Sequence, residues 1–594
     1  MAKRRASIKS FIKALVLSTK IKTPFSFAIS ILGFGMAFFP MLIALQLEAF
    51  TNNAHDLFNQ PNLLTTAIIS FGILVVLFIA QIGFSFMQTY MAAHDNQRIK
   101  HYLREQILIL LSRVPYKHIE NQGEFREKID FVKRYSGERT AGSVSLVFGW
   151  IANVIALGGV VFILWRVNPW IVSILMVTSI PAVILSMLQK EETYHAQRRW
   201  MKDGQFVIAY SDICMRTEPL KEIKFLGIYE TLKNKWRHYG KRWMANKRKL
   251  ARKHVLLNGA ADILRNVAYV AVLIIAVIEI YANPEIRLGA FMLVFSSAVA
   301  LQNITTQLLT TPASIFTDAK YMEDFFTLLD WEKETTPTDD STYNNVLIEF
   351  NNVNFSYQNS DFLALDNLNV RIKQGEKIAI VGANGSGKST FVNLLCGLHP
   401  PNSGEAKING ESITDNVWKA RRSMSVIFQN FCQYQDTLRN NIAVSDPERA
   451  GADADILALA KQTGADEVIK NQESALDEVL GIFSKDGNNL SGGQWQKVAI
   501  TRALFRKNAR VYILDEPTAA LDPIAEANIY RNFAALTGDK TTILISHRLG
   551  VTSVVDRILV FDNGRIVEDG KHDTLMRKNG LYAKMYNAQA KWYH

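Results

Sequence analysis

Six long apolar runs occupy the first half of the chain, and they constrain its fold more than any other feature. They cover residues 24–45, 63–91, 144–165, 170–188, 260–281 and 289–311. A helix needs about 20 mostly apolar residues to cross the hydrocarbon core of a bilayer. Buried helices of a large soluble protein are the alternative, but such helices usually keep a polar face, and residues 71–80 have none. The runs therefore predict a transmembrane domain of six helices over residues 1–330.

The charged residues alternate with these runs. Residues 1–23 carry seven lysines and arginines and no acid, and residues 233–254 form a second dense basic set, whereas residues 46–62 hold Glu48 and Asp56 and no basic residue. Cytoplasmic loops of membrane proteins carry the excess of Lys and Arg. We therefore expect a multi-pass protein of the plasma (inner) membrane whose N-terminus and C-terminal half are cytoplasmic. The same pattern accounts for the net charge of +12 without a nucleic-acid partner. The three cysteines, Cys214, Cys396 and Cys432, then all lie on the reducing side, where free thiols are expected.

Two segments on the basic side, residues 92–142 and 189–258, are too long to be simple loops. Both are charged and rich in helix-forming residues, so we interpret them as extensions of the neighbouring spans. About 25 residues of helix extend roughly 37 Å. Each pair of extensions must turn, and the predicted turns are Tyr116–Lys128 and Ile208–Pro219. These turns are candidate contacts for a cytoplasmic motor; helical hairpins with no coupling role are the alternative.

The pattern changes after a polar, proline-containing linker at residues 331–345. Short β-type runs follow, separated by helical stretches, which indicates an α/β domain with a largely parallel sheet over residues 346–594. The predicted strands are Val346–Phe350, Lys377–Val381, Ser425–Phe428, Arg510–Leu514, Thr541–Ile545 and Arg557–Phe561.

The second of these strands leads into a glycine-rich phosphate-binding pattern, G-x-x-x-x-G-K-S. Backbone N–H groups of such a loop and of the following helix N-terminus hold phosphate oxygens. Lys388 is expected to reach the β- and γ-phosphates of a nucleotide, and the Ser389 hydroxyl to bind Mg²⁺. The predicted nucleotide-binding residues of the loop are Gly382, Asn384, Gly385, Ser386, Gly387, Lys388, Ser389 and Thr390.

A pair of carboxylates follows the apolar strand at 510–514. Asp515 is expected to bind the nucleotide and Mg²⁺, and Glu516 is placed to act as the general base toward the attacking water. Two surface acids are the alternative interpretation, but the apolar strand before them and Pro517 after them disfavour it.

The run Leu490-Ser491-Gly492-Gly493-Gln494 lies about a hundred residues after the phosphate loop. With that loop and the Asp515-Glu516 pair, it resembles the signature of the ATP-binding cassette family. The stretch from Val346 onward is similar to the nucleotide-binding domain of its exporters, and six spans before one such domain resemble the type IV half-transporter layout. The resemblance implies ATP and Mg²⁺ as ligands, ATPase activity coupled to transport, and a dimer in which the signature closes over ATP held by the other subunit.

The same resemblance assigns roles to further residues. Tyr357 corresponds to the aromatic residue that stacks on adenine, and Gln429 to a glutamine that contacts Mg²⁺ and acts as a hinge. Leu521-Asp522 matches the D-loop, with Asp522 its acidic residue. His547 corresponds to the histidine that contacts the γ-phosphate and is, with Glu516, a candidate catalytic residue.

The neighbourhood of the signature bears on the cargo. Residues 483–497, which include Trp495 directly after the signature, are similar to exporters of lantibiotics and related ribosomal peptides. We expect outward transport of an amphipathic peptide or hydrophobic compound by a homodimer in contact with membrane lipid. A heterodimer, an importer with the same membrane fold, and a cassette that gates a channel remain alternatives. Only about 23 residues precede the first run, so a separate enzyme would trim any leader peptide.

Polar residues within or beside the spans are candidates for lining a cavity, since polar groups facing lipid are costly. Hydrogen bonds between helices are the alternative role, and Asp262 and Arg265 are spaced to pair with each other. The candidates are Gln81, Gln88, Asn153, Asp262, Arg265, Glu279, Gln302 and Asn303.

Overall fold

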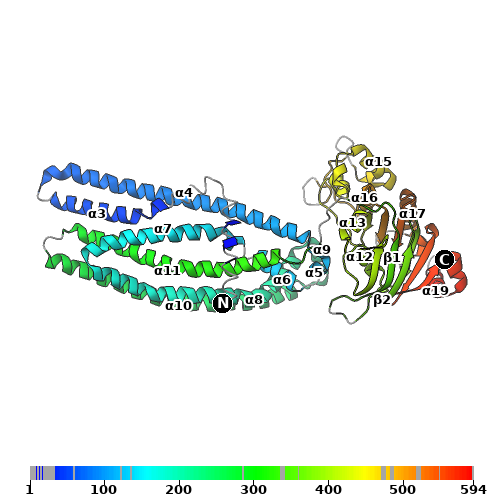
Figure 1. Ribbon diagram of the computed structural model, residues 1–594, viewed down its shortest axis with the longest axis horizontal. Coiled ribbons are helices and arrows are strands. Elements are labelled where there is room, and N and C mark those ends of the chain that lie inside the picture. Colours follow the sequence, from blue (N-terminus) through cyan, green and yellow to red (C-terminus); the bar gives the residue numbers. More distant parts are fainter. Residues whose placement is uncertain are drawn as a thin grey trace. The chain divides into compact units, whose positions relative to one another are not determined.

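The chain forms two compact units in its computed structural model, and each is described by itself (Figure 1). The first contains Met1–Ser112 and Gln122–Trp331, and the second Arg113–Asn121 and Glu332–His594. The structure describes residues 9, 12–13, 16–17, 34–57, 60–120, 123–133, 137–283, 287–334, 341–358, 360, 362–469, 476–481, 487–516, 523–546 and 549–590.

The first unit is a bundle of long helices that run alongside one another (Figure 1). Its helices are α3 (Phe39–Asp56), α4 (Leu64–Leu111), α6 (Glu124–Phe131), α7 (Gly137–Val167), α8 (Pro169–Met215), α9 (Thr217–Leu226), α10 (Tyr229–Ala282) and α11 (Gly289–Leu329), with a short 3-10 turn η1 (Pro61–Leu63). Among the described residues, six helices are long and apolar enough to cross a membrane, which confirms the predicted count. A buried cluster that includes Val160, Leu175 and Leu301 joins α7, α8 and α11.

The connection between the first two spans is shorter than predicted. Residues 46–62 were expected to form a loop, but α3 continues to Asp56. Tertiary contacts hold this polar last part of the helix: Asn52 Oδ1 accepts a hydrogen bond from the backbone N–H of Gly289 at 2.9 Å, and Asn53 donates to Ser70 Oγ at 2.6 Å. The polar residues therefore bind neighbouring helices and do not end the helix.

The two turns of the extensions differ in how well they were predicted. The first lies where expected, with α5 (Tyr116–Glu120) and α6 (Glu124–Phe131) inside or next to the predicted range. The second begins later than expected, because α8 continues through Ile208 to Met215. The chain turns at Arg216, which is extended and lies within the predicted range, and again at Gly227, whose φ of +65° ends α9. Pro219, the last residue of the predicted turn, lies in the first turn of α9, where proline is tolerated.

Five of the candidate cavity-lining residues form hydrogen bonds or ion pairs with other helices or within their own helix. Asp262 and Arg265 form an ion pair at 3.0 Å within α10, as their spacing predicted. Gln302 donates to the backbone oxygen of Arg265 at 3.0 Å. Asn153 donates to Gln307 at 3.0 Å, and Glu279 accepts from Asn168 at 3.2 Å. Hydrogen bonds between helices and one ion pair within α10 therefore account for these residues, while Gln88 and Asn303 are exposed in the single chain.

The second unit is built on two sheets. The larger has the order β10-β9-β3-β8-β7-β6, with all neighbours parallel except β10 and β9. Its strands are β3 (Lys377–Gly382), β6 (Met424–Ile427), β7 (Val511–Asp515), β8 (Thr541–Ile545), β9 (Arg557–Asp562) and β10 (Arg565–Gly570). Strands β7 and β8 are buried at every position, as expected for parallel strands covered on both faces. The predicted parallel sheet is thereby confirmed.

A separate four-stranded antiparallel sheet, β2-β1-β4-β5, was not predicted as such. Its strands are β1 (Ile348–Phe355), β2 (Leu365–Ile372), β4 (Ser403–Ile408) and β5 (Glu411–Ser412). Only β1 had been anticipated, in part. β5 has only two residues, β4 begins with three exposed residues, and β2 contains two asparagines, so they gave weak signals. Phe350 of β1 packs on Phe391 with ring centroids 4.8 Å apart, which places a shared core between the two sheets.

The helices of this unit are α12 (Lys388–Leu395), α13 (Val417–Arg422), α14 (Leu438–Ala443), α15 (Asp453–Thr463), α16 (Gly492–Phe505), α17 (Pro523–Leu536), α18 (His572–Lys578) and α19 (Leu581–Ala590), with α5 and the 3-10 turns η3 (Pro447–Arg449), η4 (Ala465–Val468) and η6 (Leu549–Val554). Helices α14, α15 and α16 enclose a core of their own, in which Trp495 is 5 % exposed and packs with Leu438 and Val498. The tryptophan after the signature is therefore a core residue of this helical part.

Candidate functional site

The phosphate loop and the paired carboxylates meet at one edge of the parallel sheet. The loop follows β3, Asp515 ends β7, and β8 lies between these strands and pairs with both. The carboxyl ends of parallel strands share an edge, which is where open α/β sheets bind ligands. Gln429 follows β6 at the same edge.

Two glycines give the loop its shape. Gly382 has φ +155°, and a Cβ there would lie 2.3 Å from the backbone oxygen of Phe561. Gly387 has φ +105°, and its Cβ would lie 2.7 Å from the backbone oxygen of Ala364. Only glycine fits at positions with this backbone and so little space. Ala383, Asn384 and Gly385 form the exposed tip between them.

Lys388 begins α12 and points back into the loop. It is 5 % exposed, and its Nζ donates to the backbone oxygens of Gly382 and Ala383, each at 3.0 Å. The same ammonium lies 3.7 Å from Oε1 of Glu516. The loop, the lysine and the second carboxylate thus converge on one point, where the lysine charge is available to a phosphate oxygen.

Asp515 carries the signs of a cation ligand. It is 4 % exposed, and its Oδ1 accepts no hydrogen bond from the described residues. Burial raises the pKa of Asp515 to about 6, and the hydrogen bond from Ser389 and the charge of Lys388 oppose that rise. An orphaned buried carboxylate oxygen beside a serine hydroxyl fits the oxygen ligands that Mg²⁺ prefers. No group of three or more His, Cys, Asp or Glu side chains suited to a metal occurs in the described part of the chain, so any other oxygens would come from Gln429 and phosphate.

Glu516 adopts a backbone conformation that is rare for a residue with a side chain. Its φ is +42°, its backbone N–H donates to Ile545 at 3.1 Å, and Oε2 accepts a hydrogen bond from Gln429 at 3.4 Å. Such left-handed residues cost about 1–3 kcal/mol and gather at functional sites. This backbone bend directs the Glu516 side chain toward Lys388 and Gln429. Residues predicted from three separate segments of the chain are thereby brought together.

Tyr357 follows β1 and packs its ring against Phe355 and His399, with centroids 5.0 Å and 5.6 Å away. Its hydroxyl lies 3.3 Å from Oγ1 of Thr390 in α12. The predicted adenine-stacking residue and the phosphate loop's helix are thereby in contact.

The signature residues form the start of α16. Ser491 caps the helix: its Oγ accepts from the Gln494 backbone at 3.3 Å, and the Gln494 side chain accepts from the Ser491 backbone at 2.9 Å. This reciprocal capping box stabilises the N-terminus and fixes the direction in which its N–H groups and partial positive charge point. Leu490 is buried beneath it. Asp522 and His547 lie outside the described residues, as do Pro517 and Leu521.

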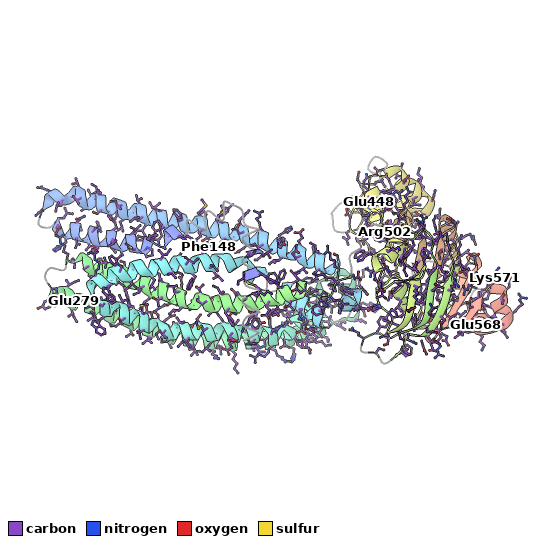
Figure 2. All side chains as sticks on the ribbon, in the orientation of Figure 1. Phe148, Glu279, Glu448, Arg502, Glu568 and Lys571 are labelled. Atoms are coloured by element: carbon purple, nitrogen blue, oxygen red, sulfur yellow. The ribbon has the colours of Figure 1, made fainter. Side chains whose placement is uncertain are left out.

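Sequence reasoning missed the arginine that connects α16 to the segment after Gln429. Arg502, labelled in Figure 2, donates to the backbone oxygen of Asn441 at 2.7 Å, to that of Cys432 at 2.9 Å and to Asn441 Oδ1 at 3.1 Å. Its guanidinium carbon lies 4.7 Å from the Tyr434 ring centre. The only sequence signal was its place on the helix that follows the signature.

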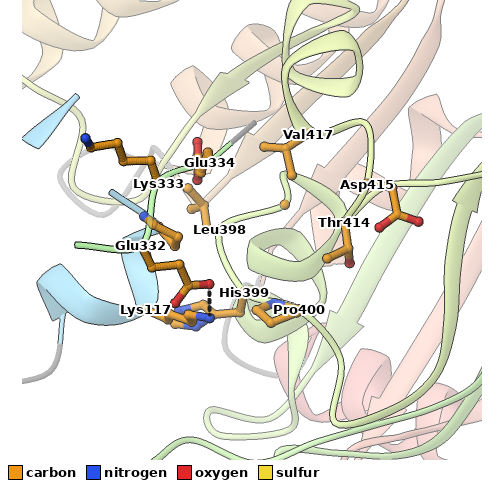
Figure 3. A pocket seen from close by; sticks show the side chains of 12 residues that line it. Lys117, Glu332, Lys333, Glu334, Leu398, His399, Pro400, Thr414, Asp415 and Val417 are labelled. Carbon is orange, nitrogen blue, oxygen red and sulfur yellow. Dashed lines mark hydrogen bonds and ion pairs between the residues drawn. The ribbon is translucent and has the colours of Figure 1, made fainter. Parts of the chain in front are cut away.

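His399 was also missed. It is 5 % exposed, and Nε2 lies 3.0 Å from Oε2 of Glu120, in the first predicted turn. Burial lowers the pKa of the imidazole, and the Glu120 charge opposes this. Lys117 of the same turn pairs with Glu332 at 3.0 Å. Lys117, Glu332 and His399 are among the residues that line a cavity of about 350 Å³ (Figure 3). Within this unit, His399 therefore contacts both the ring of Tyr357, the candidate adenine-stacking residue, and Glu120 of the first predicted turn.

The comparisons with known proteins agree with this geometry. Residues 365–519 match the family described as ABC transporter. The chain is 30% identical over 529 residues to the subtilin transport ATP-binding protein SpaT of Bacillus subtilis, covering 86% of this chain and 85% of that protein. It is 29% identical over 523 residues to the ATP-dependent lipid A-core flippase of Haemophilus influenzae, covering 85% of each. The fold is similar to that of a bacterial Atm1-family ABC exporter with ATP bound, with a TM-score of 0.78, 24% identity, and coverage of 94% of this chain and 98% of that one.

The chain belongs to the ATP-binding cassette transporter family. It is a multi-pass integral membrane protein whose α/β domain binds ATP and whose ATPase activity is coupled to transport across the membrane.

Proposed function

We propose that this chain exports an amphipathic peptide or another hydrophobic compound, and that it does so as a homodimer in the plasma (inner) membrane. The observation that carries the proposal is the likeness to a subtilin transport protein over 85% of that protein's length. The six-span unit and the cluster of Lys388, Asp515 and Glu516 support an active pump. Because lipid A-core flippases are also similar to it, a lipid cargo is the second candidate.

The chemistry rests on the residues at the sheet edge. Lys388 and the loop N–H groups bind and orient the β- and γ-phosphates, and Tyr357 stacks on the adenine. Ser389, Asp515 and Gln429 would hold Mg²⁺, which neutralises charge on the phosphates when bound. Glu516 accepts a proton from the attacking water through its carboxylate, and His547 contacts the γ-phosphate.

A dimer follows from the arrangement of one chain. It carries one phosphate loop and one signature, and the signature from Leu490 to Gln494 begins α16, a different element from the loop. We propose that Ser491, Gly492, Gly493 and Gln494 face ATP on the partner subunit. Because each predicted ATPase residue is present in this sequence, two identical subunits form two equivalent sites.

The direction of transport is proposed from the basic segments and the exporter-like fold. The N-terminus and the ATP-binding unit are assigned to the cytoplasm by the positive-inside rule. ATP then closes the two cassettes, the turns between the helical extensions transmit the movement, and the cargo site opens to the outside. Hydrolysis resets the cycle.

The test uses inside-out vesicles, in which the ATP-binding unit faces the added nucleotide. A panel of labelled amphipathic peptides, dyes and lipid A-like lipids is offered, and lumenal accumulation is compared for the native protein and Glu516→Gln. ATP-dependent uptake of a peptide or dye that the variant loses supports export. Efflux of preloaded solute on adding ATP would instead establish import, and movement of the lipids alone would favour a flippase.

A further inference from the structure

The cytoplasm-assigned part of α10 carries an unusual excess of positive charge. Residues 233–254 contain ten lysines and arginines and no aspartate or glutamate. Three carboxylates supply partners: Glu230 for Lys233 at 2.7 Å, Asp203 of α8 for Arg242 at 3.9 Å, and Glu192 of α8 for Lys253 at 2.9 Å. The remaining seven lysines and arginines outnumber the carboxylates that α8 and α10 place near them.

Three of these cations surround a hollow on the surface of α10. Ala245, Arg248, Lys249 and Arg252 line a space of about 280 Å³. Their spacing, i, i+3, i+4 and i+7, places them on one face of the helix, and the short side chain of Ala245 leaves the room between the longer ones. All three cationic side chains are exposed, and among the described residues no carboxylate lies within 4 Å of them. We call Arg248, Lys249 and Arg252 the α10 basic cluster.

The cluster lies directly beside an apolar stretch of α10 that is exposed in the single chain. Exposed apolar side chains recur along the helix from Val255 (69 % exposed) and Leu256 (74 %) to Tyr281 (90 %). Twenty-seven residues of helix extend about 40 Å, close to the thickness of a bilayer with its headgroups. Arg252 and Arg248 precede Val255 by three and seven residues. They therefore lie about 5–10 Å from Val255 along the helix axis. By this measure the cluster begins about 5–10 Å beyond the headgroup layer, a distance that long arginine and lysine side chains reach across by extending toward the interface.

We propose that the α10 basic cluster binds the phosphate of an anionic phospholipid headgroup in the bilayer leaflet on the side of the ATP-binding unit. Arg and Lys next to a span attract anionic lipid, and the arginine fork also forms paired hydrogen bonds with phosphate oxygens. The occupant is resident membrane lipid. The proposal rests on the six spans and not on the identity of the cargo. A purely topogenic role, in which the charges orient the chain during insertion and bind nothing, is the competing explanation.

The experiment compares two triple variants of the full chain in nanodiscs. One is Arg248→Gln with Lys249→Gln and Arg252→Gln; the control is Lys235→Gln with Arg237→Gln and Lys241→Gln, which removes the same charge from the same helix farther from Val255. Nanodiscs contain phosphatidylcholine alone or with phosphatidylglycerol, and binding of phosphatidylglycerol is measured by exchange of a fluorescent analogue. Each lost cation is expected to weaken binding about fivefold at low salt. The cluster variant should therefore lose far more affinity than the control.

Equal loss in the two variants, or none in the cluster variant, would overturn the proposal. An Arg248→Lys with Arg252→Lys variant keeps the charge and should retain most of the binding, which separates ligand binding from a folding defect. Inorganic phosphate serves as a competitor: displacement of the lipid at low millimolar phosphate would assign the hollow to a soluble anion instead. ATP-driven movement of the analogue between leaflets, lost in Glu516→Gln, would assign it to cargo and also count against a resident lipid.

Discussion

The ammonium group of Lys388 lies 3.7 Å from a carboxylate oxygen of Glu516, although the two residues are 128 positions apart in the chain. Both are largely buried, with side chains 5% and 14% exposed. This ion pair connects the phosphate loop directly to the candidate general base. We expect different effects from replacing each residue, because Lys388 is a cation that binds phosphate and Glu516 is a carboxylate that takes a proton.

Replacing Glu516 by glutamine should abolish turnover while ATP binding persists. The amide keeps the size of the side chain and its contact with Gln429 but cannot take a proton, so the ATPase rate should fall about 10²–10⁴-fold. Phosphate release and fluorescent-nucleotide binding would be measured on the same preparation, with Glu467→Gln, a surface residue paired with Lys497, as the control. Near-normal ATPase activity in Glu516→Gln would show that another group is the base.

Lys388→Ala should weaken ATP binding. A charge-assisted hydrogen bond to phosphate contributes about 1.5–3 kcal/mol, so the dissociation constant should rise on the order of tenfold or more. The effect should be much smaller for AMP, which has no β- or γ-phosphate for the lysine to reach. If AMP and ATP lost equal affinity in nucleotide titrations, the lysine would be acting through loop structure rather than through the phosphates.

Arg502→Ala should destabilise the helical part around α16. The arginine satisfies the backbone oxygens of Asn441 and Cys432, and removing it leaves these acceptors without that donor, at a cost of about 2–4 kcal/mol. Arg565→Ala is a suitable control, because Arg565 is 63% exposed and its ion pair with Asp366 should contribute less than about 1 kcal/mol. Thermal unfolding in nanodiscs would compare the two; equal shifts would contradict the role given to Arg502.

His399 should make stability depend on pH. Burial lowers the pKa of the folded imidazole below its ordinary value of about 6.5, so the unfolded chain binds a proton more readily as the pH falls below that value. The His399 contribution to stability is therefore present above pH 6.5 and declines below it. His399→Gln should flatten the difference in melting temperature between pH 7.5 and 5.5. Asp515 has a raised pKa and changes stability in the opposite sense, but it does so in both proteins, so the difference between them isolates His399.

The three thiols should differ in reactivity. All are free, as expected; Cys432 is exposed, Cys214 is half-buried, and burial raises the pKa of Cys396 to about 12. Because the thiolate is the reactive form, a maleimide should modify Cys432 first and leave Cys396 unmodified in the folded protein. Mass spectrometry after brief labelling reads the order, and Cys432→Ser should remove the fast phase. Fast labelling of Cys396 would indicate that its surroundings open readily.

The sequence by itself determined the class of this protein, the six spans and the loop that holds phosphate. These features depend on local patterns: apolar length sets what crosses a bilayer, and the glycines, Lys388 and Ser389 are contiguous in the chain. Strand β8 was predicted to the residue because its apolar run is bounded on both sides.

Only the tertiary structure decided which distant residues meet. No local pattern shows that Asn52 holds the end of α3 through Gly289, or that α8 continues past Ile208 as far as Met215. Strands β2, β4 and β5 obtain their hydrogen bonds within their sheet, β2 and β4 from β1 and β5 from β4. His399, Arg502 and the α10 basic cluster likewise take their significance from neighbours brought together by folding, since burial and the nearest opposite charge are properties of the folded chain and not of a segment.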